Sequence, residues 1–172
     1  TVSMTGQTLT TLAVRIAEEG AALTLGEVPG EGVLRNATGF DEILFDNRSS
    51  YPLMVNAAFS ESGSDITLHK HGSGTVNLNG RVTVSGLTRV LEGELAWGAL
   101  PEDSTHTIGS SVEVTGGRET PVTVRVNGAS QLTGVGNIRV GTNAGDRCVM
   151  VLDGGLNVQA LPGEANKKLH VG

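Results

Sequence analysis

Apolar and polar residues alternate along most of the chain. Short segments in which every second residue is aliphatic recur at 66–68, 76–78, 82–84, 112–114, 122–126, 138–140 and 156–158. Alternate residues of a β-strand point to opposite faces of a sheet. Each segment therefore buries Val, Leu or Ile and exposes Thr, Asn, Glu or Arg. The pattern predicts many short strands and little or no α-helix.

Residues 9–19 fit two interpretations. Their apolar positions have helical spacing, and Gly20 would end such a helix. The same residues also alternate, and a strand would bury Leu12, Val14 and Ile16. We favour the strand because the surrounding sequence alternates in the same way.

Glycine supplies 25 of the 172 residues and falls mostly between the alternating segments. Because it accepts positive φ without a Cβ clash, it is typical of corners and tight turns. Asn-Gly steps such as 79–80 ordinarily indicate antiparallel hairpins. Here the strands are too short for a typical sandwich and the corners too frequent. The pattern favours a solenoid, and coils of roughly 20–25 residues would give about seven or eight of them.

Composition narrows the class of protein. The net charge is −6, and only five side chains are aromatic. Both facts argue against a nucleic-acid surface, which needs positive charge and rings that stack on bases. No apolar stretch approaches the ~18 residues of a membrane span. The scarcity of rings predicts a narrow interior of small aliphatics, and the single Cys148 excludes a disulfide within the chain.

Two segments near the end of the chain repeat each other. Residues 137–141 (Asn-Ile-Arg-Val-Gly) return as 168–172 (Lys-Leu-His-Val-Gly), an offset of 31 residues that is typical of repeat architectures. The sequence starts without Met, shows no signal peptide and stops within this pattern. We therefore expect a fragment of a longer protein, whose bare end coils would pair with adjacent coils of the parent chain or associate end to end.

The middle of the chain contains a more specific motif. The segment from Lys70 to Leu78 has the pattern Lys-x-Gly-x-Gly-x-Val-x-Leu, and residues 92–98 supply a Gly-x-Leu-x-x-Gly ending. It resembles the autotransporter-associated β-strand repeat. The motif positions are Lys70, Gly72, Gly74, Val76, Leu78, Gly93, Leu95 and Gly98. Residues 43–59 resemble the strand pair that often comes just before such a repeat, and residues 87–90 depart from the pattern.

This resemblance implies a right-handed parallel β-helix from the passenger region of a secreted or surface-displayed bacterial protein. It covers residues 40–172, whereas 1–39 match weakly. We expect residues 1–172 to form a single β-solenoid segment, with 1–39 as N-terminal coils.

Few side chains suggest catalysis. Parallel β-helices also occur in polysaccharide lyases and hydrolases, which need clustered carboxylates. Stacking could bring Glu94 and Glu113 onto adjacent coils of one face, so they are the catalytic candidates. Tyr51 and Trp97 are the aromatic candidates for binding a sugar.

No metal or cofactor site is expected. His69 and His71 would share a strand face, as a metal pair might, but no Asp, Glu or Cys in that segment completes a ligand set. Residues 141–146 have the polar turn character of calcium-binding β-rolls, yet lack the glycine doublet and the repetition of that pattern. We interpret them as a plain loop.

The sequence thus favours a non-catalytic structural or adhesive segment that extends a surface protein and presents its faces to a host protein, a cell-surface protein or a glycan. The alternative is a carbohydrate-active or glycan-binding β-helix domain. Neither nucleic acid nor a membrane span is expected as a partner.

Overall fold

A computed structural model describes residues 1–63, 65–100, 105–108, 111–117, 119–127, 132–133, 136–153 and 168–171, with only the backbone described at 132–133 and 168–171. The strands are β1 (Thr8–Thr11), β2 (Ala13–Ile16), β3 (Leu23–Leu25), β4 (Val33–Asn36), β5 (Glu42–Asn47), β6 (Leu53–Val55), β7 (Ala58–Ser60), β8 (Thr67–His71), β9 (Thr75–Leu78), β10 (Val82–Val84), β11 (Thr88–Val90), β12 (Glu94–Trp97), β13 (His106–Ile108), β14 (Ser111–Val114), β15 (Val122–Asn127), β16 (Leu132–Thr133), β17 (Asn137–Val140), β18 (Cys148–Asp153) and β19 (Lys168–Val171).

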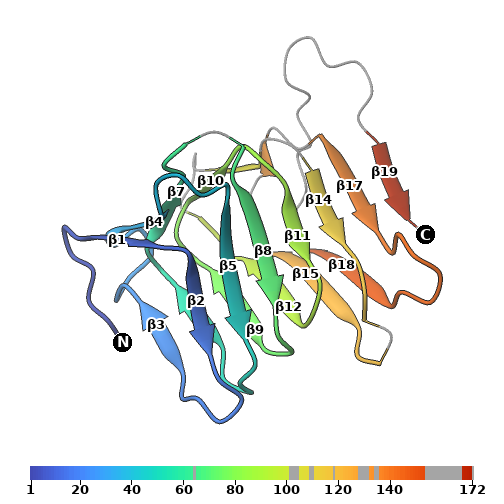
Figure 1. The fold of residues 1–172 in the computed structure, drawn as a ribbon, viewed down its shortest axis with the longest axis horizontal. Helices are drawn as coiled ribbons and strands as arrows, with labels where there is room; N and C mark the ends of the chain where they lie inside the picture. Colours follow the sequence, from blue (N-terminus) through green and yellow to red (C-terminus); the bar gives the residue numbers. More distant parts are fainter. Residues whose placement is uncertain are drawn as a thin grey trace.

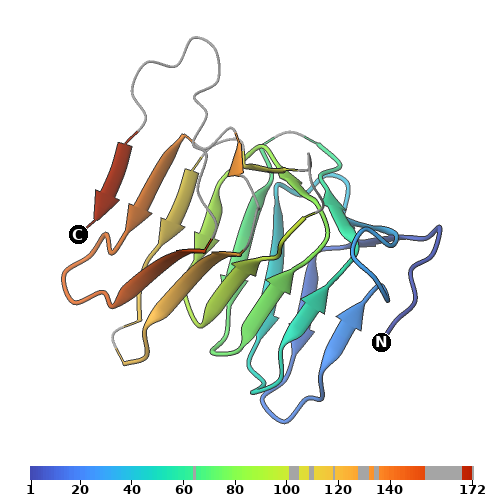
Figure 2. The same cartoon turned by 180° about the vertical axis from the view of Figure 1, so that it is seen from behind.

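From β1 to β18 every third strand belongs to the same sheet, and β19 joins the sheet of β17. The first sheet has the order β1-β4-β7-β10-β13-β16, the second β2-β5-β8-β11-β14-β17-β19 and the third β3-β6-β9-β12-β15-β18. All strand pairs among the described residues are parallel, and the stacked coils form a β-solenoid (Figure 1). Figure 2 shows the third sheet from behind, with its strands stacked from the N-terminal to the C-terminal end. The predicted fold class is confirmed.

The coils are fewer and longer than predicted. The stack makes about five turns rather than seven or eight. Glu94 pairs with Thr75, an offset of 19 residues, whereas Leu44 pairs with Ala13, an offset of 31. The difference lies in the corners, which vary in length while the strands stay short. The repeat at 137–140 and 168–171 is a true coil spacing, because Asn137 pairs with Lys168.

Alternation predicted the strands well. The alternating segments between residues 66 and 140 all lie in or directly beside strands. Residues 9–19 are strand rather than helix, as expected, but they divide between β1 and β2 instead of forming one strand. Val14 and Ile16 are buried as expected, whereas Leu12 lies between the two strands and is 42% exposed. Residues 43–59 hold three strands, one for each sheet, rather than a pair. The predicted strand 156–158 lies outside the described residues.

Each coil contributes inward side chains that stack on those of the next coil. In the second sheet, Ile43, Leu68, Thr88, Val112 and Ile138 form one inward column. The interior is wider than its aliphatic composition suggests. Trp97, Phe45 and Phe59 are fully buried in it, so most of the few rings in the chain belong to the core. No helix in the described part is long and apolar enough to cross a membrane.

Candidate functional site

A buried lysine lies near the end of β8, before the corner that leads to β9. Lys70 faces inward because it alternates with outward His69 and His71, and its side chain is fully buried. Its Nζ donates hydrogen bonds to the carbonyl oxygens of His71 (2.8 Å), Gly72 (2.6 Å) and Glu92 (2.9 Å). Burial lowers the pKa of Lys70 to about 8, although the Glu92 and Asp46 carboxylates oppose this shift. The ammonium therefore remains charged at neutral pH and holds two successive corners together.

The motif glycines lie where successive corners touch. A Cβ on Gly74 would overlap the carbonyl oxygen of Ser49, one coil earlier. A Cβ on Gly93 would lie 2.5 Å from the carbonyl oxygens of both Gly72 and Gly74. Gly72 and Gly93 also have φ angles of 75° and 66°, which glycine adopts without strain. Each glycine therefore permits the close stacking of one corner on another.

Asparagines perform the same task at the corner that follows the third sheet. The Asn56 amide donates to the Gly26 carbonyl at 2.9 Å, and the Asn79 amide donates to Asn56 Oδ1 at 2.9 Å. Gly98 follows in the next coil, where a Cβ would lie 2.6 Å from Asn79 Oδ1. The remaining motif positions, Val76, Leu78 and Leu95, are buried in the core. The eight motif residues thus serve stacking.

The structure does not bring Glu94 and Glu113 together on one face. Glu94 begins β12 in the third sheet, whereas Glu113 lies on β14 in the second. Their separation of nineteen residues is less than one coil here, because β11 pairs with β14 at an offset of 24. The expected pairing would require a coil of nineteen residues between β11 and β14, where the coil has 24.

Both carboxylates instead face arginines. Glu113 contacts Arg89 at 3.0 Å on one side and Arg139 at 2.8 Å on the other, so the three form a ladder across β11, β14 and β17. Glu94 contacts Arg125 at 3.1 Å. Both carboxylates therefore take part in ion pairs between neighbouring coils.

The two aromatic candidates differ in accessibility. Tyr51 lies at the corner between β5 and β6 and is 57% exposed. Trp97 is fully buried, and its Nε1 has no hydrogen-bond partner in the described part of the chain. Trp97 is therefore a core residue and not a binding surface, which corrects the sequence-based candidate. Its position in the alternation of β12 already places it inward, in register with Leu78.

His69 and His71 share the outward face of β8 as predicted, with 6.1 Å between their ring centroids. Among the described residues, no group of three or more His, Cys, Asp or Glu is placed to hold a metal ion. In the 141–147 loop, Asp146 accepts a hydrogen bond from the Asn143 backbone at 3.0 Å. That hydrogen bond belongs to an ordinary turn. Burial raises the pKa of the nearby Cys148 thiol.

Sequence analysis missed a buried imidazole in the core. His106 is fully buried on β13, which pairs with β10. Its Nδ1 accepts the Val82 N–H at 3.2 Å, and its Nε2 lies 3.0 Å from the Gly98 carbonyl oxygen. This arrangement requires the neutral ring protonated at Nε2, and burial accordingly lowers the pKa of His106. The alternation of residues 106–108 could have indicated that His106 faces the core together with Ile108.

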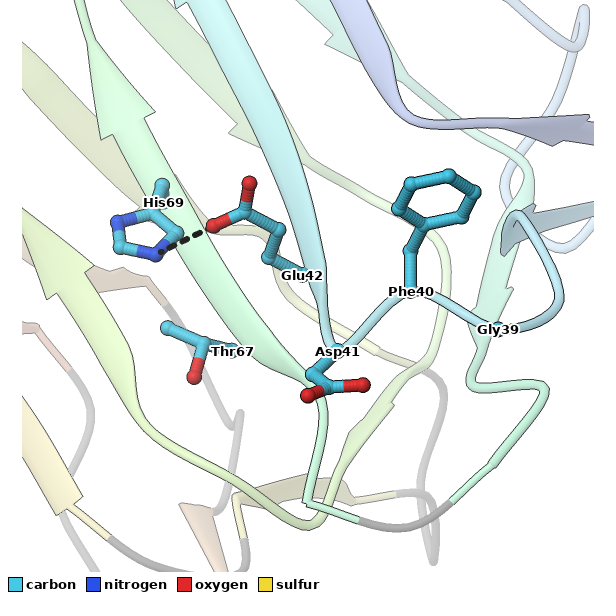
Figure 3. A pocket seen from close by; sticks show the side chains of 6 residues that line it. All are labelled: Gly39, Phe40, Asp41, Glu42, Thr67 and His69. Atoms are coloured by element: carbon cyan, nitrogen blue, oxygen red, sulfur yellow. Dashed lines mark ion pairs between the residues drawn. The ribbon is translucent and has the colours of Figure 1, made fainter.

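A shallow depression lies where β5 and β8 begin (Figure 3). It has a volume of about 360 Å³ and is lined by Gly39, Phe40, Asp41, Glu42, Thr67 and His69. The Phe40 ring is 50% exposed. Glu42 points toward His69, with 3.5 Å between Oε2 and Nε2, while Phe40 and Asp41 point to opposite sides of the chain. Burial lowers the pKa of His69, so its ring is uncharged at neutral pH. The depression therefore offers carboxylates, a hydroxyl and a ring edge to a ligand.

Comparison with known proteins adds no relative. No family model, curated protein or solved structure matches this chain.

Proposed function

We propose that this chain is a non-catalytic, structural or adhesive β-solenoid segment of a secreted or surface-displayed bacterial protein. One observation supports it above the others: the lysine and the glycines of the repeat motif act between coils. Lys70 and the motif glycines hold successive corners together. The resemblance of residues 70–98 to the autotransporter-associated repeat agrees with this proposal. Adjacent coils are then the first partners of each coil, and a host or cell-surface molecule is the external one.

Surface display is tested by labelling cells. Antibodies raised against the 172-residue chain should bind intact cells of the organism that produces it, as strongly as permeabilised cells. Antibodies against a cytoplasmic protein should bind only after permeabilisation. Labelling of the solenoid that also requires permeabilisation, with none in the culture medium, would refute both display and secretion.

The non-catalytic character is tested on polymers. We expect no cleavage of neutral or acidic polysaccharides, measured as new reducing ends or as new unsaturated products. If cleavage occurs, Glu94→Ala and Glu113→Ala test the original candidates, and Glu19→Ala is an exposed control. Turnover that is lost only with Glu94 or Glu113 would overturn the proposal and support a carbohydrate-active domain.

A second candidate function is binding of a neutral glycan, and the depression favours it. An exposed aromatic ring beside carboxylate and hydroxyl groups suits a sugar, whose C–H face packs on the ring while its hydroxyls donate to the oxygens. The volume of about 360 Å³ lies near the lower end of the ~300–1,000 Å³ of ligand pockets. The two acidic side chains disfavour polyanionic sugars.

This alternative is tested by titrating neutral oligosaccharides while recording NMR shifts of residues 39–42. Phe40→Ala should remove binding, and Tyr51→Ala should preserve it because Tyr51 lies at a different corner. Absence of shifts at millimolar sugar, or binding that survives Phe40→Ala, would eliminate the depression as a glycan site.

A further inference from the structure

Two histidines and a glutamate lie together on the outer face of the second sheet. His69 and His71 both face outward on β8, and Glu42, at the start of the neighbouring strand β5, points toward His69 (Figure 3). Lys70, between the two histidines, faces inward and uses its ammonium on corner carbonyls. The carboxylate that the segment around the histidines lacks is therefore supplied by the adjacent coil, and the lysine does not repel a cation there.

The distance between His69 and Glu42 is too long for a good hydrogen bond. Nε2 and Oε2 are 3.5 Å apart, whereas an N–H···O bond spans about 2.7–3.2 Å. The distance instead fits two ligand atoms of one zinc ion. With bonds of about 2.0–2.1 Å from zinc to nitrogen and to oxygen, tetrahedral geometry separates the two ligand atoms by about 3.3 Å.

His71 completes this set of ligands by a small movement. The ring centroids of His69 and His71 are 6.1 Å apart, whereas two imidazoles on one tetrahedral zinc ion have centroids about 5 Å apart. Rotation of the half-buried His71 side chain between its rotamers covers a change of this size. Within the described part of the chain, no hydrogen bond fixes its ring. Before such a rotation, no three metal-binding groups of the described residues are in position.

The charges around the histidines leave one carboxylate without a cationic partner. The other charged side chains beside them in register are already paired, Arg89 with Glu113 at 3.0 Å and Asp46 with Arg48 at 3.2 Å. Among the described residues, the partner of Glu42 is His69, whose ring is uncharged at neutral pH because burial lowers its pKa. A bound cation would supply the missing positive charge, and an uncharged imidazole is the form that binds a metal.

We propose that Glu42, His69 and His71 bind a zinc ion, with water in the fourth coordination position. Two imidazoles and one carboxylate are a set of ligands that zinc takes in proteins, and a water in the fourth position leaves the metal accessible to a further ligand. The inference goes beyond the proposed structural or adhesive role, because it assigns a metal to three named side chains on one face of the solenoid.

Calorimetric titration of the 172-residue chain with zinc, without a histidine tag, tests the site. One zinc ion per chain should bind with a micromolar dissociation constant. Loss of a group that merely orients a metal ligand costs about 10–100-fold in affinity, so His69→Ala and His71→Ala should each weaken binding by at least about tenfold. Glu42→Gln keeps the size of the side chain and removes its charge, and it should also weaken binding by about tenfold.

Asp41→Asn is the matched control for Glu42→Gln. Asp41 lines the same depression and loses the same charge, but it does not belong to the proposed set of ligands, so zinc affinity should stay unchanged. Cys148→Ser should also leave it unchanged, which excludes the thiol as a ligand. Binding that survives His69→Ala or His71→Ala, equal effects of Glu42→Gln and Asp41→Asn, or saturation only at millimolar zinc would overturn the site. Circular dichroism checks that each variant is folded.

Imidazole NMR signals provide an independent measurement. One equivalent of zinc should shift the ring signals of both His69 and His71 and leave those of the buried His106 unchanged. A shift of only one of the two rings would contradict a shared metal. Phe40→Ala, which should remove glycan binding, should preserve zinc binding, so these two proposals fail separately. Neither measurement bears on surface labelling or on polysaccharide cleavage.

Discussion

The ammonium of Lys70 donates a 2.9 Å hydrogen bond to the backbone carbonyl of Glu92, which lies one coil further along the stack. Two more donors of the same nitrogen bond carbonyls within the Lys70 corner itself. Because all three N–H groups are used, a charge enclosed in the solenoid has no unsatisfied donor. The Lys70 ammonium thus links two successive coils by hydrogen bonds.

Removing the Lys70 ammonium should destabilise the fold. Lys70→Met keeps most of the buried stem but leaves three carbonyl oxygens without their donor, and each such loss costs about 1–3 kcal/mol when no water replaces it. We expect the free energy of unfolding in urea to fall by about 3 kcal/mol. Arg15→Met, at an exposed position of β2, is the control and should change it by less than about 0.5 kcal/mol. Equal effects of the two variants would contradict the role of Lys70.

Gly6 and Gly93 have nearly the same φ, so replacing each by alanine distinguishes the cost of backbone strain from the cost of steric crowding. Gly93 (φ 66°) would place a Cβ against the Gly72 and Gly74 carbonyls, whereas Gly6 (φ 65°) has open space around it. Gly6→Ala should therefore show only the left-handed backbone cost of about 1–2 kcal/mol. Gly93→Ala should lose a further 1–3 kcal/mol, roughly, from overpacking. Urea denaturation of both variants measures the difference, and equal losses would mean that the corners are not tightly stacked.

Glu31 accepts hydrogen bonds from residues 3–5, which cover the N-terminal end of the core. Met4 is buried there. The Glu31 carboxylate accepts hydrogen bonds from Thr5 Oγ1 and from the backbone of Met4. These contacts, the Thr5 bond first, lower the pKa of Glu31 to about 2 from a usual 4.5. The stabilisation is complete above pH 4.5 and disappears as the pH falls toward 2.

We therefore expect the NMR signal of the Met4 methyl group to move toward its unfolded position across this pH range. Glu31→Gln should show the same shift at neutral pH, because the amide is uncharged and a weaker acceptor. The methyl group of Met54, in β6, is the internal control. A Met4 signal that is unaffected by Glu31→Gln would show that the carboxylate does not hold this segment.

His106 should make stability depend on mildly acidic pH. Burial lowers the pKa of its ring, so between the usual value of 6.5 and the lower folded value the unfolded chain binds more protons. Stability therefore falls as the pH drops below 6.5, since a proton on Nδ1 would face the Val82 N–H. His106→Leu should be less stable than the original chain at pH 8, and the gap should narrow toward pH 5. Urea midpoints at both pH values test this, and a constant gap would refute it.

The candidate functional residues could be predicted only in part, because the lengths of the corners between strands cannot be read from the sequence. Alternation and glycine placement identified the strands and favoured a solenoid, because a strand shows its inward residues at every second position. The parallel strands and the motif positions were expected from the resemblance of residues 70–98 to a known repeat. Glu94 and Glu113 were paired incorrectly because the residue count between strands does not reveal how much of it a corner consumes. The Phe40–Glu42 depression was missed for the same reason: its other wall, at Thr67 and His69, is one coil away.

The sequence by itself determined most of the inward positions and favoured a solenoid, because apolar residues alternate within each strand. For Trp97 and Lys70 the residue type did not predict burial. A tryptophan can lie on a binding surface, and a lysine ammonium normally stays in water. Only the tertiary structure decided their roles, because burial depends on what the neighbouring coils supply. Trp97 stacks between Leu78 and Val126, and the corners around Lys70 present three carbonyls to its ammonium. The alternation of side chains between the two faces of a strand is a local property, whereas neighbours and ion pairs follow from the register between coils.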